Sequence, residues 1–147
     1  MSKFVFRLQA ALDLRERELA CRVAELEMRR SELRANLLEQ AGLQAGLDQL
    51  EREFVGLSGA RQSPLEFIHY VDYRHGLELA LDRLKESQVL LEENVRAAEE
   101  IVQEAARTHR RLELLKERTL EAWRSEQQHK EIQLIDEWGS MRSGRST

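Results

Sequence analysis

The chain has 147 residues, of which 34% are charged and only 5% aromatic, and its formal net charge is −4. One proline and seven glycines leave it rich in helix formers and poor in turn and strand material, which argues against an ordinary globular domain. The negative net charge, and basic ends that lack interleaved aromatic residues, argue against nucleic acid as a partner.

The first predicted element is a long helix over about residues 3–55. From its start, every seventh residue is large and apolar, with a single polar exception, Gln40. Such a repeat places one apolar stripe along one face of a helix and is typical of a coiled coil. The positions are Val5, Leu12, Leu19, Leu26, Leu33, Gln40, Leu47 and Phe54.

A turn is predicted next, over about residues 56–63, where two glycines precede the only proline, Pro64. Ser63, Pro64 and Glu66 fit a helix start, as N-cap, first helical residue and capping-box glutamate. Because the connection is short, the flanking helices are expected to run antiparallel beside each other.

The second predicted helix covers about residues 64–138, and a disordered tail over about 139–147 is expected to follow. Its seven-residue repeat continues the coiled-coil pattern of the first helix. The repeat consists of Tyr70, Leu77, Leu84, Leu91, Ala98, Ala105 and Leu112.

Residues 1–147 are therefore predicted to form a single all-α domain, a long antiparallel two-helix coiled-coil hairpin. Placing the hinge between Ser58 and Gly59 sets the two stripes in register. The expected pairs are Leu33 with Leu84, Leu26 with Leu91, Leu19 with Ala98 and Leu12 with Ala105.

In this register the second helix overshoots the first, so an unpaired C-terminal helical overhang is expected after about Arg118. Apolar groups on an unpaired helix indicate a partner protein. The overhang carries Trp123, Ile132, Leu134, Ile135 and Trp138.

Catalysis is not expected from this sequence. It has no glycine-rich phosphate loop, no cysteine with a plausible histidine partner and no turn-borne serine. The four histidines are not spaced to place two on one helical face, so we expect no metal and no cofactor. The single Cys21 indicates a reducing compartment, and no apolar stretch approaches the roughly 18 residues of a membrane span.

Both ends of the chain resemble one known family. The chain opens with Phe4-Val5-Phe6 and reaches an Arg15-Glu16 pair after several leucines. It closes with Leu112–Arg118 and Glu131–Glu137. Together with the length and the hairpin layout, these stretches resemble the flagellar export protein FliJ family over the whole chain.

The resemblance implies a stalk-like coiled coil that binds the hexameric export ATPase and the export gate, a membrane protein, and couples ATP hydrolysis to protein export. Export chaperones are further candidate partners. It also implies a cytoplasmic protein, peripheral at the cytoplasmic face of the inner membrane at the flagellar base. The implied ATPase-binding residues are Phe4, Phe6, Arg7, Arg15, Trp123, Ile132, Ile135 and Trp138.

The implied gate-binding residues lie near the turn and are Phe67, Ile68, Tyr70, Val71 and Tyr73. From the residues alone, Phe67 and Tyr70 fit the apolar stripe better than a contact surface, and Tyr73 is the better exposed candidate. Two alternatives stay open: a structural coiled coil that dimerises or tethers other proteins, and the equivalent stalk of a virulence injectisome.

Overall fold

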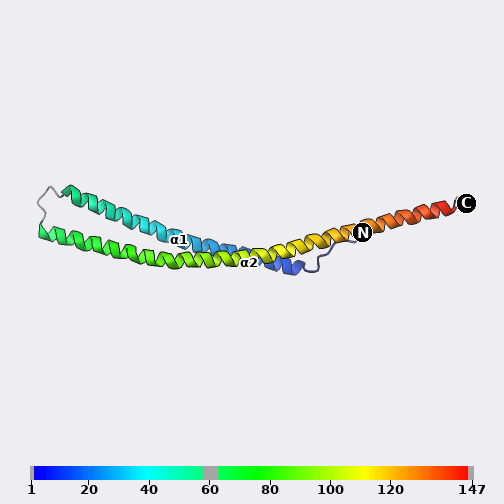
Figure 1. Cartoon of the computed structure of the whole chain (residues 1–147), viewed down its shortest axis with the longest axis horizontal. Helices are drawn as coiled ribbons and strands as arrows, with labels where there is room; N and C mark the ends of the chain where they lie inside the picture. Colours follow the sequence, from blue (N-terminus) through cyan, green and yellow to red (C-terminus); the bar gives the residue numbers. More distant parts are fainter. Residues whose placement is uncertain (1, 58–62, 146–147) are drawn as a thin grey trace. The chain divides into compact units, whose positions relative to one another are not determined.

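The computed structural model describes residues 2–57 and 63–145, which contain two α-helices and no strand. Helix α1 spans Gln9–Leu57 and helix α2 spans Pro64–Arg145 (Figure 1). The two helices pack together as a hairpin, which confirms the predicted all-α fold.

Contacts divide the chain into two compact units. The central unit, Arg22–Val102, contains the end of α1 and the beginning of α2. The terminal unit, Met1–Cys21 and Gln103–Thr147, contains the beginning of α1 and the rest of α2. The residues implied in gate binding thus lie in the central unit, and those implied in ATPase binding lie in the terminal unit.

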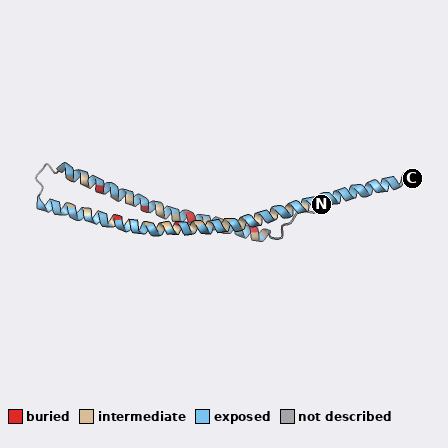
Figure 2. Ribbon diagram, viewed as in Figure 1, coloured by how far each residue is buried: buried red, intermediate tan, exposed pale blue. Residues whose placement is uncertain are grey.

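The core of each unit is a thin line of apolar side chains between the helices. Leu26, Leu47, Leu81 and Val95 are buried in the central unit, and Leu12 is buried in the terminal unit. Most other residues of the described chain are half-buried or exposed (Figure 2). Because two helices bury only their facing stripes, stability depends on few positions.

Each helix contributes a second stripe that the seven-residue repeat of leucines did not reveal. On α1, Asn36 is buried and Leu43 and Leu50 are half-buried, three residues after members of the predicted stripe. On α2, Leu81 and Val95 are buried four residues after members of its stripe. The pair of stripes is the usual a and d pattern of a coiled coil.

The predicted register is wrong by about one heptad, or ~10 Å of helix. The Leu84 carbonyl accepts a hydrogen bond from Asn36 Nδ2 at 3.0 Å, so Leu84 lies level with Asn36 and Gln40 rather than with Leu33. Near the turn, the Phe54 ring stacks on Tyr70 at a centroid distance of 3.9 Å. The predicted hinge, Ser58 and Gly59, lies outside the described residues.

A cluster of polar side chains explains this register. Gln40 Nε2 donates to Gln88 Oε1 at 2.9 Å and to Asn36 Oδ1 at 2.6 Å. In the expected register, Asn36 and Gln40 would instead face apolar side chains of α2 and lose these partners. Buried amides without hydrogen bonds are costly, so matching the polar positions decides between registers that match leucines about equally well.

The first helix begins at Gln9, later than the expected residue 3. Residues 2–6 are not helical, and Phe4 and Phe6 are covered while Val5 is 82% exposed. Alternate residues of a non-helical, extended segment point to opposite sides, so Val5 does not belong to the helical stripe as predicted. We call residues 2–8 the strap.

The second helix begins where the sequence predicts and ends later than predicted. Ser63 Oγ accepts a hydrogen bond from the Glu66 backbone nitrogen at 3.2 Å, as expected of an N-cap. At the other end α2 continues to Arg145, although a disordered tail was expected from about residue 139. A single glycine such as Gly139 costs a helix only about 1 kcal/mol, which does not suffice to end it.

Candidate partner-binding sites

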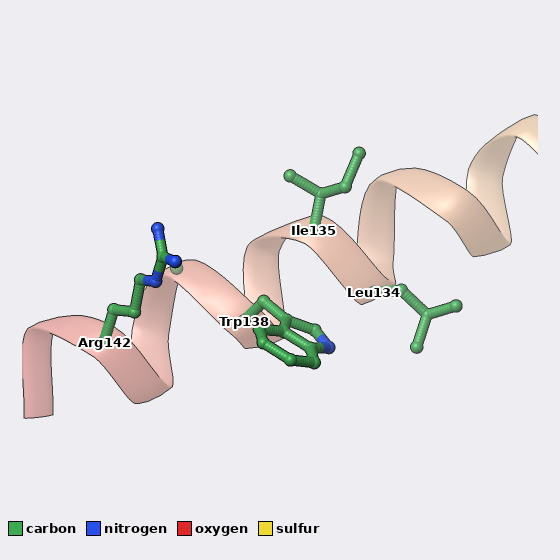
Figure 3. Close-up of a pocket in the computed structure, with 5 residues that line it drawn as sticks. Leu134, Ile135, Trp138 and Arg142 are labelled. Atoms are coloured by element: carbon green, nitrogen blue, oxygen red, sulfur yellow. The ribbon is translucent and has the colours of Figure 1, made fainter. Parts of the chain in front are cut away.

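An apolar surface lies on the last turns of α2. Leu134, Ile135, Trp138 and Met141, which we call the C-terminal stripe, are all exposed, Trp138 to 67%. Leu134, Ile135 and Trp138 line a shallow hollow with Gly139 and Arg142 (Figure 3). Spacings of three and four residues place these side chains on one side of the helix. Such a group, flanked by a guanidinium, suits a protein partner better than water.

The C-terminal stripe extends a face of α2 that is already used for packing. Leu120, Trp123 and Gln127 are half-buried and succeed one another at the same three- and four-residue steps. Beyond Gln127, every residue up to Gly144 is exposed. Contacts within the chain therefore cover this face up to about Gln127 and leave the C-terminal stripe open.

A second surface surrounds the start of α2 in the central unit. The Phe54 ring contacts both Tyr70, at 3.9 Å, and Phe67, at 6.0 Å between centroids. A hollow of about 800 Å³ is lined by these rings together with Val55, Val71 and His75. We call four exposed apolar residues of this region the turn-side patch: Phe67, Ile68, Val71 and Tyr73. The first three share one side of α2, and Tyr73 lies on the other side of Tyr70.

An ion-pair network anchors the hollow. Arg74 contacts Glu51 of α1 and Glu78 of α2, each at 3.0 Å. The hydrogen bond to Glu78 raises the pKa of Arg74, and Tyr70 and Glu51 raise it further. The charged guanidinium thus bridges a carboxylate of α1 and one of α2 beside the turn-side patch.

Within residues 2–57 and 63–145 we find no group of histidine, cysteine and carboxylate side chains arranged to hold a metal ion. Over the same residues, neither helix contains a segment that is long and apolar enough to cross a membrane.

The family of this chain follows from its similarity to a family model. A family model described as flagellar FliJ protein matches residues 3–147. The chain belongs to the FliJ family. FliJ proteins are non-catalytic components of flagellar protein export, so this chain is a flagellar export component. No curated protein and no solved structure matches it.

The phenylalanines of the FliJ-type opening are covered within the chain, whereas residues that bind the ATPase were expected to be exposed. Phe6 is buried, and the Phe4 ring contacts the Trp123 ring at a centroid distance of 5.9 Å. The sequence predicted that Trp123 lies in an unpaired overhang. That prediction is wrong, because the shifted register gives Trp123 a partner. The Phe4 and Trp123 rings thus partly cover each other, and Phe6, two residues after Phe4, is buried.

The other residues expected at the ATPase lie on the surface of this FliJ chain. Ile132, Ile135 and Trp138 are exposed, although Ile132 lies to the side of the C-terminal stripe. Arg7 is exposed as well. Arg15 is also exposed, and it forms an ion pair with Glu18 at 2.8 Å within α1.

Of the residues expected at the gate, Tyr70 is the one held in the interior, since it is half-buried under Phe54. Phe67, Ile68, Val71 and Tyr73 are exposed, Tyr73 to 60%. Sequence reasoning assigned Phe67 to the helix interface, but its ring only touches the edge of the cluster at Phe54. It also missed the part that Phe54 takes in the cluster, because the predicted register paired Tyr70 with no aromatic residue.

Proposed function

We propose that this FliJ-family chain binds the hexameric flagellar export ATPase through its terminal unit and the export gate through the turn-side patch. It would act as a stalk or adaptor that links ATP hydrolysis to export at the cytoplasmic face of the inner membrane. Export chaperones would be further partners.

The observation that carries the proposal is the exposed C-terminal stripe. It presents four large, exposed apolar side chains on one side of the last turns of α2. Apolar helix faces of this kind bind in grooves or channels of protein partners, with a few anchors supplying most of the affinity. The central channel of a ring-shaped ATPase offers a surface of that kind.

The turn-side patch supports the second half of the proposal. It lies in the other unit, so one chain carries two separate apolar surfaces. A linker between two partners needs such an arrangement, whereas a protein that only dimerises needs one surface. The tether alternative therefore accounts for less of the exposed apolar surface than the adaptor does.

Removing residues 128–147 tests the ATPase contact. The truncation leaves the contact between Phe4 and Trp123 in place but deletes the C-terminal stripe. We expect helicity by circular dichroism to fall only by the deleted turns, while stimulation of the cognate flagellar ATPase and assembly of its hexamer fall about tenfold or more.

Undiminished stimulation by the truncated chain would refute the ATPase contact. If the full chain instead sediments as a stable dimer at micromolar concentration and the truncated chain as a monomer, the stripe serves dimerisation and the tether alternative is correct.

Two tyrosines three residues apart test the turn-side patch. Tyr73→Ala removes an exposed ring, so we expect gate binding to weaken about fivefold or more while the melting temperature is unchanged. Tyr70→Ala removes the ring stacked on Phe54 and should instead lower the free energy of unfolding by about 2 kcal/mol. Pull-down with the soluble domain of the gate protein and thermal denaturation separate the two effects. The patch is not the gate contact if Tyr73→Ala binds as well as the parent.

A further inference from the structure

The strap attaches to the same face of α2 that carries the C-terminal stripe. Phe4 lies on Trp123, and Phe6 is buried two residues further along the strap. Figure 1 shows the strap running beside α2 toward the C-terminal end of that helix. Trp123 and the stripe residue Trp138 are in helical phase, so the strap covers the stretch of this face that precedes the stripe.

We propose that the strap is a removable cover that competes with the ATPase for this face of α2. An apolar helix face of the ring partner would first bind the C-terminal stripe and then replace Phe4 on Trp123. The proposal rests on the proposed function and adds to it an autoinhibitory contact within the chain.

The strap is joined to α2 by contacts of a kind that a partner protein can replace. Among the hydrogen bonds of the described residues, none joins the strap to α2. The strap backbone is instead bonded locally to α1, where the Gln9 nitrogen donates to the Phe6 oxygen at 3.1 Å and the Leu12 nitrogen to the Leu8 oxygen at 2.9 Å. The contact between the Phe4 and Trp123 rings joins it to α2, and a partner that offers apolar side chains can replace such a contact without leaving polar groups unpaired.

The position of Trp123 and the C-terminal stripe on one face of α2 is a second reason. This face presents Leu120 and Trp123, then the polar Gln127 and Glu131, and then the residues of the stripe. A partner helix that follows the stripe toward Trp123 reaches Phe4 within about four turns of α2. Release of the strap would open the stretch of this face around Trp123, so the partner could cover a longer part of α2.

The first arm of the test uses the protein alone. In a Trp138→Phe background, Trp123 is the only tryptophan and reports on its own surroundings. We expect the double variant Phe4→Ala, Phe6→Ala to shift Trp123 emission to longer wavelength and to raise its quenching by acrylamide, with helicity retained. Val5→Ala is the matched control, because Val5 lies between the two phenylalanines and points outward. Unchanged quenching in the double variant would overturn the cover.

The second arm measures affinity for the purified cognate ATPase, with Trp138 intact. If the strap competes, Phe4→Ala, Phe6→Ala should bind roughly fivefold tighter than the parent, because the competent state no longer has to be released. Equal binding would show that the two phenylalanines do not affect ATPase binding, and weaker binding would show that they contact the ATPase directly. Either result would overturn the competition. If neither protein binds the ATPase, the proposed function fails and the competition with it, while the fluorescence arm still decides whether the strap covers Trp123.

Discussion

Trp138→Ala is expected to weaken binding to the export ATPase by about 2 kcal/mol, or roughly thirtyfold in Kd. Trp138 is 67% exposed and lies at the centre of the C-terminal stripe, between Leu134 and Met141. Tryptophan anchors at interface centres are among the residues whose truncation costs most, whereas an exposed side chain contributes little to folding. Titration of labelled protein with the ATPase measures the loss.

Asp136→Ala provides the control for this prediction. Asp136 is exposed and lies on the opposite side of α2, so its removal should leave both the affinity and the helicity of the chain unchanged. A Trp138→Ala protein that binds as tightly as the parent would remove the stripe from the ATPase contact.

Gln40→Ala is expected to lower the free energy of unfolding by about 2 kcal/mol. The side-chain amide of Gln40 links Asn36 on α1 to Gln88 and the Leu84 carbonyl on α2. Removal of this amide takes a hydrogen-bond donor away from Asn36 Oδ1, Gln88 Oε1 and the Leu84 carbonyl, within a core that is only a few residues wide. Urea denaturation followed by circular dichroism measures the change.

Gln44→Ala is the matched control, since Gln44 lies one turn further along α1 and bonds only to exposed Asp48. We expect it to change the free energy of unfolding by less than about 0.5 kcal/mol. Equal effects of the two substitutions would show that the polar cluster does not stabilise the hairpin.

The hairpin could be predicted from the sequence because its cause is local and repetitive. Leu12, Leu26 and Leu47 recur at seven-residue steps, and each is buried in the structure. Ser63 and Pro64 likewise mark the start of α2 through local chemistry alone. Features that depend on one helix and on neighbouring residues in sequence can therefore be predicted from the sequence alone.

The register could not be predicted in the same way, because leucine stripes fit together about equally well at every heptad. Asn36 decides between the choices, yet a lone asparagine in a sequence does not reveal which carbonyl it will meet. The signal that was available is the presence of polar residues in both stripes, Gln40 and Gln88, which pair when they are placed close together. Matching polar positions before leucines would have favoured the observed register.

The strap was missed for a different reason. A seven-residue count carried back to Val5 makes the helix seem to begin before Gln9. The alternation of Phe4, Val5 and Phe6 has a period of two, which is typical of extended chain and not of a helix. Misplacing the strap also misplaced the start of the unpaired part of α2, because Phe4 gives Trp123 its partner.

The contact between Phe4 and Trp123 also fixes an order of events during synthesis. Phe4 leaves the ribosome well before its partner Trp123, which follows more than a hundred residues later in the sequence. Closing so long a loop has a large entropic cost, whereas contacts such as that of Phe54 with Tyr70 close a short one. Phe4 of a nascent chain therefore stays uncovered until Trp123 has also been synthesised, so this contact forms after the contacts near the turn.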